Sequence, residues 1–159
     1  MNTQLLIGLL LTITPLIELR LGLPIVIDYC LKNNLSIGLY STIVISLNIL
    51  LILAIFLFMD LFHKTFLKIP LYEKVFGSSI SKIQKKAEKV KEGKFNSRFI
   101  ALAIFVAIPL PGTGAWTGTL IAWLLGLNRI KSFIAIALGV IIAGIIILFG
   151  SLGLFSFFY

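Results

Sequence analysis

The sequence has few residues of the types that catalytic and metal sites require. Its 159 residues include one cysteine, Cys30, one histidine, His63, and six acidic residues. A single cysteine excludes a disulfide or a thiolate metal cluster within one chain. No serine, histidine and acid set, no metal-ligand spacing and no phosphate-binding loop of a soluble enzyme is present. We therefore expect no enzyme, no metal and no cofactor.

Charged residues are also scarce, at 13% of the chain, whereas a soluble domain has roughly 25%. Hydrophobic residues make up 59%, and the mean hydropathy is +1.10. This composition predicts an integral membrane protein with one domain, residues 1–159. The first residues, Met1 to Gln4, carry no positive side chain, so we expect the first hydrophobic segment to stay in the mature protein.

The basic residues are concentrated in one stretch. Of the fourteen, ten lie between Lys64 and Arg98, and they account for most of the net charge of +8. In a chain this apolar, such a block predicts a cytoplasmic loop, residues 63–97, rather than a nucleic-acid site. Apolar residues at helical spacing within it predict an amphipathic helix on the membrane surface. Anionic lipid headgroups are the expected partners of Lys82, Lys85, Lys86 and Lys89.

Four hydrophobic segments flank this loop. Segments 35–61 and 132–158 are uninterrupted and suit a membrane span of ~20 residues. Segments 5–27 and 99–127 are interrupted by prolines and glycines. In lipid, a broken helix is tolerated only where protein or a wet cavity covers it.

The two halves of the chain repeat the same order: interrupted segment, short polar turn, uninterrupted helix. At a constant offset of 94 positions, Pro15-Leu16 falls on Pro109-Leu110. If each interrupted segment is a re-entrant hairpin, Arg129 and Lys131 share the cytoplasmic side with the basic loop, and both termini lie outside. Four simple spans, the alternative, would put Arg129 and Lys131 outside.

We therefore predict an all-α integral membrane protein built as an inverted repeat, an arrangement typical of transporters. The first repeat, residues 1–62, has a re-entrant hairpin at 5–27 and a helix at 35–61. The second repeat, residues 98–159, has a hairpin at 99–127 and a helix at 132–158.

Glu18 and Arg20 are ionisable residues deep in a hydrophobic segment. Each charge would cost about 2.5–3.5 kcal/mol at the bilayer centre, so both need partners. On a helix, positions i and i+2 face nearly opposite ways, but in an extended or broken stretch they can share a side. Arg20 suits a phosphate or carboxylate, and Glu18 suits proton coupling. A structural role is the alternative, as a buried pair or as separate bonds to backbone carbonyls.

The second interrupted segment has two prolines and two glycines within residues 109–114. Proline cannot continue helix hydrogen bonding, and glycine allows a tight turn with exposed N–H groups. A helix restarting near Trp116 would direct its positive end at this turn, which predicts an anion site. Trp116 either shelters the turn or fills space. The predicted substrate or ion site comprises Glu18, Arg20, Pro24, Pro109, Pro111, Gly112, Thr113, Gly114, Trp116 and Thr117.

Other polar and small residues have structural interpretations. We expect Asn48 to form a helix–helix hydrogen bond and Asp28 to be solvated. Gly118, Ala122 and Gly126 recur every four residues, a spacing that allows close helix packing in membranes.

The stretch Glu18 to Pro24 (ELRLGLP) and the stretch Pro109 to Gly118 (PLPGTGAWTG) resemble the motifs of the small multi-drug export protein family. This family looks like a compact relative of the DedA/VTT (SNARE-associated) membrane transporter superfamily. The resemblance covers nearly the whole chain and implies two re-entrant hairpins and lipid translocation, including proton-linked recycling of polyprenyl-phosphate carriers. The chain departs from the DedA pattern because it has no acid or arginine between Arg98 and Arg129.

Three functional hypotheses follow. The first is a flippase for a phosphate-bearing lipid such as a polyprenyl phosphate, held by Arg20 and the 111–114 turn and coupled to protons by Glu18. The second is a multidrug exporter that exchanges cationic amphiphiles for protons at Glu18. The third is a non-transport membrane assembly protein whose basic loop recruits a partner. All three place the chain in the cell membrane, and we expect a homodimer because one copy shelters little irregular backbone.

Overall fold

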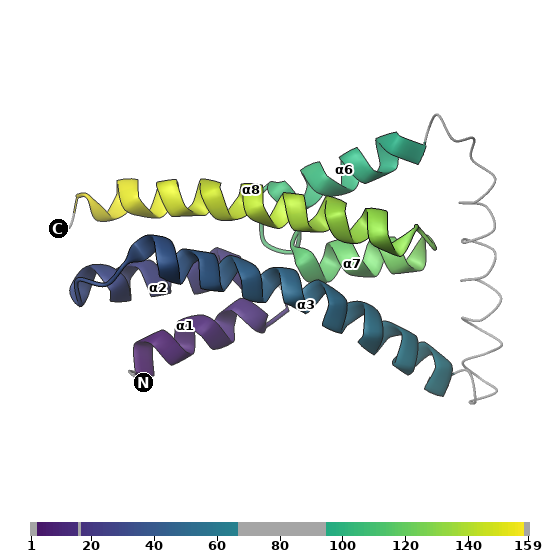
Figure 1. The fold of residues 1–159 in the computed structure, drawn as a ribbon, viewed down its shortest axis with the longest axis horizontal. Coiled ribbons are helices and arrows are strands. Elements are labelled where there is room, and N and C mark those ends of the chain that lie inside the picture. Colours follow the sequence, from purple (N-terminus) through teal and green to yellow (C-terminus); the bar gives the residue numbers. More distant parts are fainter. Residues whose placement is uncertain (1–2, 16, 67–94, 158–159) are drawn as a thin grey trace.

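The computed structural model describes residues 3–15, 17–66 and 95–157, and these residues are helical apart from short turns. The prediction of an all-α protein is confirmed (Figure 1). The predicted surface helix and its lysines Lys82, Lys85, Lys86 and Lys89 lie outside the described residues. The helices are α1 (Thr3–Ile13), α2 (Glu18–Lys32), α3 (Ile37–Phe66), α6 (Phe95–Ala107), α7 (Ala115–Leu124) and α8 (Arg129–Phe155).

Helices α3 and α8 are long and apolar enough to cross a membrane. Both differ in their bounds from the predicted 35–61 and 132–158. Helix α3 continues to Phe66, into the stretch we assigned to the loop. Helix α8 begins at Arg129 because the side chain of Asn128 accepts a hydrogen bond from the Lys131 backbone N–H, at 3.1 Å. The short polar turn that we expected before this helix is therefore the cap and first turn of α8.

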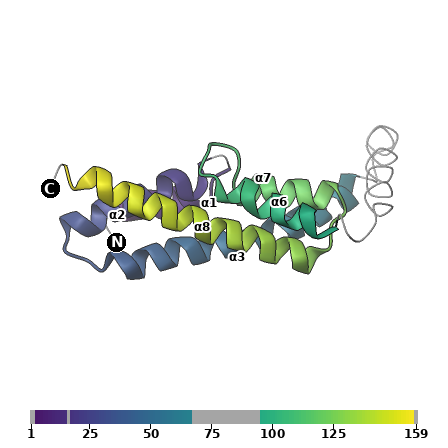
Figure 2. The ribbon, with the colours of Figure 1, turned by 90° about the horizontal axis from the view of Figure 1, so that it is seen from above.

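The other helices form two hairpins that approach each other from opposite ends of the molecule (Figures 1 and 2). Helices α1 and α2 pack against each other, whereas α6 packs mainly on α8, and α7 packs against α3 and α8. The hairpin tips, around Pro15 and Pro111, meet near the middle. The start of α1 and the end of α8 lie at one end, and the α7–α8 turn lies at the other.

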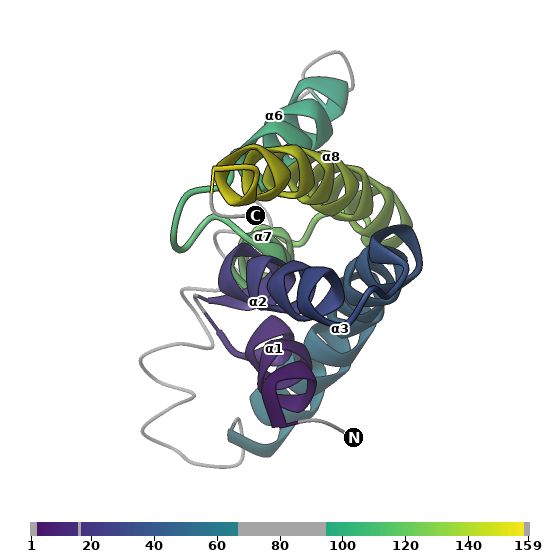
Figure 3. The ribbon, with the colours of Figure 1, turned by 90° about the vertical axis from the view of Figure 1, so that its left-hand side faces the viewer.

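The N-termini of the half-length helices α2 and α7 face each other. Viewed along the long axis, they lie nearly in line (Figure 3). The expectation that Pro24 interrupts the first segment is wrong, since α2 continues through it to Lys32. Proline removes one i→i−4 hydrogen bond, but its neighbours Leu23 and Val26 are completely buried and hold this part of α2 in the core.

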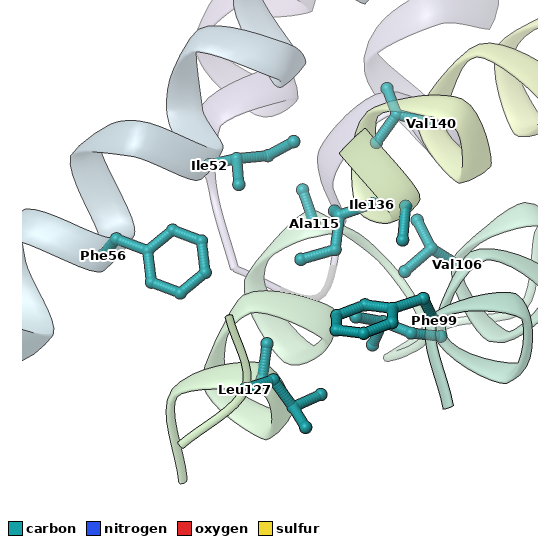
Figure 4. Packing of buried hydrophobic residues seen from close by; sticks show 11 residues of the cluster. Ile52, Phe56, Phe99, Val106, Ala115, Leu127, Ile136 and Val140 are labelled. Atoms are coloured by element: carbon teal, nitrogen blue, oxygen red, sulfur yellow. The ribbon is translucent and has the colours of Figure 1, made fainter. Parts of the chain in front are cut away.

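Two apolar clusters form the core, one around each hairpin. The first joins α6, α7 and α8 to the second half of α3 and is shown in Figure 4. The second joins α1 and α2 to the first half of α3 and to α8. A Cβ at Gly118 would lie 2.7 Å from Val106, so this glycine allows α7 to approach α6. Gly126, which we had assigned to the same packing face, is instead exposed with φ +62° just after α7.

Candidate functional site: the junction of the two hairpins

The buried ion pair between Glu18 and Arg20 lies where the hairpin tips meet. Arg20 Nη1 donates to Glu18 Oε2 at 3.2 Å, and the two side chains are 10% and 3% exposed. Glu18 has φ +45°, a conformation that is uncommon for residues other than glycine. Glu18 is the first residue of α2, but its left-handed φ departs from the right-handed helix, so the rule that separates positions i and i+2 does not apply and the two charges share one side.

The Glu18 carboxylate caps the N-terminus of α7. The backbone N–H of Ala115 donates to Oε2 and that of Trp116 donates to Oε1, both at 2.9 Å. The first N–H groups of a helix have no partner within it, and the helix dipole favours a negative charge there. Since α2 also directs its N-terminus at this point, the carboxylate lies between two positive helix ends.

Gly114 provides the space for this contact. A Cβ at this position would overlap the Glu18 carboxylate and lie 2.5 Å from Arg20 Nη1. Its backbone angles, φ −89° and ψ −160°, are extended and accessible to any residue. Glycine is therefore required here for the approach of the carboxylate and not for its backbone conformation.

Arg20 also binds the turn before α7. Its Nη2 donates to Thr113 Oγ1 at 2.7 Å and to the Ile108 carbonyl at 3.4 Å. The Thr113 hydroxyl in turn lies 2.6 Å from that same carbonyl, to which it can donate. Gly112, with φ +83°, allows the chain to turn here. Among the described residues, Arg20 Nε is buried and has no hydrogen-bond partner.

Trp116 and Asn48 bind the tip of the first hairpin. Trp116 Nε1 donates to the Ile13 carbonyl at 3.0 Å, and Asn48 Nδ2 donates to the Thr12 carbonyl at 2.9 Å. These carbonyls belong to the last turn of α1, where no partner exists within the helix. The predicted helix–helix hydrogen bond of Asn48 is confirmed, and Trp116 joins the two hairpins directly.

The structure brings together half of the predicted site. Pro109 and Pro111 form the turn itself, whereas Thr117 lies in the first turn of α7 and Pro24 lies about 9 Å along α2 from Glu18. The helix end that was expected to attract a substrate anion is occupied, because the Ala115 and Trp116 N–H groups are bonded to Glu18. The residues in mutual contact are Glu18, Arg20, Thr113, Gly114 and Trp116.

A second polar cluster, which the sequence interpretation missed, lies at the end where α8 begins. Arg129 binds both carboxylate oxygens of Asp60, at 2.6 and 2.9 Å, and Trp123 Nε1 donates to Asp60 Oδ1 at 2.9 Å. These residues come from α3, α7 and α8. Asp60 lies near the end of an apolar segment, and no local spacing connects it to Arg129, 69 positions away.

At the opposite end, Asp28 differs from its expected solvated state. Its side chain is 20% exposed, and Oδ2 lies 2.7 Å from both Lys32 Nζ and Gln4 Nε2. Gln4 belongs to α1, so this carboxylate connects the two helices of the first hairpin. In the described part of the chain, no three His, Cys, Asp or Glu residues group closely enough to hold a metal ion.

The fold and the site together define a small helical protein with two potential membrane spans and a buried ion pair between two hairpins. The chain belongs to the family described as "Putative small multi-drug export protein", whose model matches residues 18–146. A family of export proteins implies a membrane location and a transporter rather than an enzyme. The predicted family is thereby confirmed, and its description agrees better with multidrug export than with lipid translocation. Comparisons with curated proteins and with solved structures gave no match.

Proposed function

We propose that this protein exports small amphipathic molecules across the cell membrane in exchange for protons, with Glu18 as the proton-carrying group. One observation carries the proposal: the Glu18 carboxylate, buried in the middle of the molecule, joins the first hairpin to α7 of the second. Ionisable residues at membrane depth mark transport pathways and proton relays in many transporters.

Protonation of Glu18 would weaken the junction. The ionised carboxylate accepts two backbone N–H bonds and the bond from Arg20. Hydrogen bonds to charged groups contribute about 1.5–3 kcal/mol each, roughly twice the value for neutral pairs. Only the two backbone N–H bonds cross from one hairpin to the other. Neutralising Glu18 would weaken each by about half, which removes about 1.5–3 kcal/mol from the contact between the hairpins and favours their separation.

In the membrane, we place both hairpins as re-entrant elements of an inverted repeat. The start of α1 and the end of α8 share one end, which we assign to the outside. The end that carries Arg129 and Lys131 would face the cytoplasm under the positive-inside rule, together with the basic loop and its lipid-binding lysines. A homodimer would shelter the hairpins further.

A specific observation favours a second candidate, the translocation of a phosphate-bearing lipid such as a polyprenyl phosphate. Arg20 and the N-terminus of α7 make the surroundings of Glu18 positive, which suits an anion better than a cation. In this alternative, the substrate phosphate would replace the Glu18 carboxylate when Glu18 is protonated.

Transport into and out of liposomes with a pH gradient tests both candidates. We expect the reconstituted protein to move an amphipathic dye against its gradient and Glu18→Gln to abolish the movement. Asp28→Asn is a matched control, because Asp28 is also a bound carboxylate but lies outside the junction. Thermal unfolding in detergent should show that both variants are folded. An unchanged rate in Glu18→Gln would reject the coupling role, whereas movement of labelled polyprenyl phosphate, but not of the dye, would favour the second candidate.

A further inference from the structure

A groove between α3 and α8 lies beside the Asp60 cluster, away from the hairpin junction. Its volume is about 340 Å³, within the range of roughly 300–1,000 Å³ that is usual for small-molecule sites. Its walls are apolar except at one end, where Asp60 and Arg129 meet. The lining residues are Leu53, Phe56, Leu57, Asp60, Arg129, Ile130 and Phe133.

The groove has the two parts that an amphipathic molecule requires. Leu53, Leu57 and Ile130 are between 52% and 72% exposed, so the apolar wall is open at the surface of the molecule. Phe56 and Phe133 add aromatic faces to it, and such faces attract cations. A ligand with an apolar body and a charged group could therefore place its body on the wall and its charge at the Asp60 end.

The charge expected of this ligand follows from the unequal burial of Asp60 and Arg129. The Asp60 side chain is 21% exposed and also accepts the Trp123 indole N–H, whereas the Arg129 side chain is 63% exposed. Arg129 forms two hydrogen bonds with Asp60, but its guanidinium is exposed and recovers bonds to water when another cation replaces it. An anion would have to displace Asp60, which is more buried and is held by a second element. A cation can replace Arg129 on the carboxylate without displacing Asp60 or breaking its bond to Trp123.

We propose that Asp60 and this groove form a binding site for amphipathic cations, which replace the Arg129 guanidinium on the carboxylate. The inference rests on the proposed export function, in which this site would take up substrate at the end we assign to the cytoplasm. The groove is spatially separate from Glu18, so cation binding there should depend on Asp60 and not on Glu18.

Trp123 provides a direct readout, because its indole donates to Asp60. The chain has two tryptophans, so Trp116→Phe leaves Trp123 as the single tryptophan, which can be excited selectively over the four tyrosines. In this background, the full-length protein in detergent is titrated with tetraphenylphosphonium and, separately, with tetraphenylborate. The two probes have the same shape and opposite charge. We expect saturable changes in Trp123 emission with the cation and none with the anion.

Variants of the ion pair have opposite expected effects. Asp60→Asn should weaken binding of the cation by about tenfold or more. Arg129→Gln should strengthen it by about two- to fivefold, because the competing guanidinium is removed. If the ion pair had only a structural role, the two substitutions would not change the affinity for the cation in opposite directions. Binding that is unchanged in Asp60→Asn, or that is lost in Arg129→Gln, would overturn the proposal, and tighter binding of tetraphenylborate would identify an anion site instead.

The same titration separates this site from the transport proposal. Glu18→Gln should leave the affinity for tetraphenylphosphonium within about twofold, since Glu18 belongs to the other cluster. Normal binding together with proton-independent transport would reject only the coupling role of Glu18. Proton-coupled transport without saturable binding at Trp123 would reject only the Asp60 site.

Discussion

Gly114→Ala is the sharpest test of the junction, because it adds one methyl group at the point of closest approach. The added Cβ would overlap the Glu18 carboxylate and crowd Arg20. The extended backbone of Gly114 suits alanine, so the substitution introduces no backbone strain. Its effect should come from displacing the Glu18 carboxylate and the Arg20 guanidinium bound to it.

The expected loss can be worked out from the bonds that the displacement would break. Glu18 Oε2 accepts from the Ala115 N–H at 2.9 Å and from Arg20 Nη1 at 3.2 Å. At about 1.5–3 kcal/mol for each bond to a charged group, losing both costs about 3–6 kcal/mol. For a chain of this size, that corresponds to a fall in Tm of roughly 6 °C or more.

The assay is thermal unfolding in detergent, followed by tryptophan fluorescence. Gly150→Ala is the matched control, because it adds the same methyl group to a glycine with nothing within 4 Å. Alanine is favoured over glycine within a helix by about 1 kcal/mol, so the control should be neutral or stabilising. Glu18→Ala provides a second background, in which the added methyl group has no carboxylate to displace.

Two results would refute the reasoning. The first is a Tm for Gly114→Ala equal to that of the Gly150→Ala control. The second is the same loss of stability from Gly114→Ala whether Glu18 is present or replaced by alanine, because a double-mutant cycle must show coupling between residues in contact.

Three further substitutions test the contacts around the junction by the same unfolding measurement. Asn48→Ala should lower stability by about 1–3 kcal/mol, because it leaves the buried Thr12 carbonyl without its donor; an unchanged Tm would mean that water or another group replaces the amide. Trp116→Phe should cost about 1 kcal/mol through loss of the bond to the Ile13 carbonyl, and no change would show that this contact between the hairpins is dispensable. Gly118→Val should cost about 1–3 kcal/mol by overpacking α7 against α6, and tolerance of valine would show that the two helices can separate there.

Much of the architecture followed from local sequence features. The long apolar runs predicted α3 and α8, and the prolines and glycines at 109–114 predicted the break before α7. The unusual charges Glu18 and Arg20 identified the first hairpin as the charged one. These features act over a few residues, through backbone hydrogen bonding and the cost of charge in lipid, so they can be read without the fold.

Other expectations failed because packing overrode a local rule. Pro24 was expected to break its segment, but it lies within α2, which Leu23 and Val26 hold in the core. Gly126 was expected to pack, but it ends α7 instead with a positive φ. Local sequence does not show which side of a helix will meet another helix.

The partners of the charged residues were decided by the tertiary structure alone. Glu18 binds N–H groups 97 and 98 positions away, and Asp60 binds Arg129 across 69 positions. Helical periodicity relates only residues three or four apart, so no pattern in the chain connects these groups. From the sequence, we could predict an anion-attracting helix end near Trp116 and a charged carboxylate within the first hairpin. That the two meet follows only from the fold, in which the hairpins bring the N-termini of α2 and α7 together with Glu18 between them.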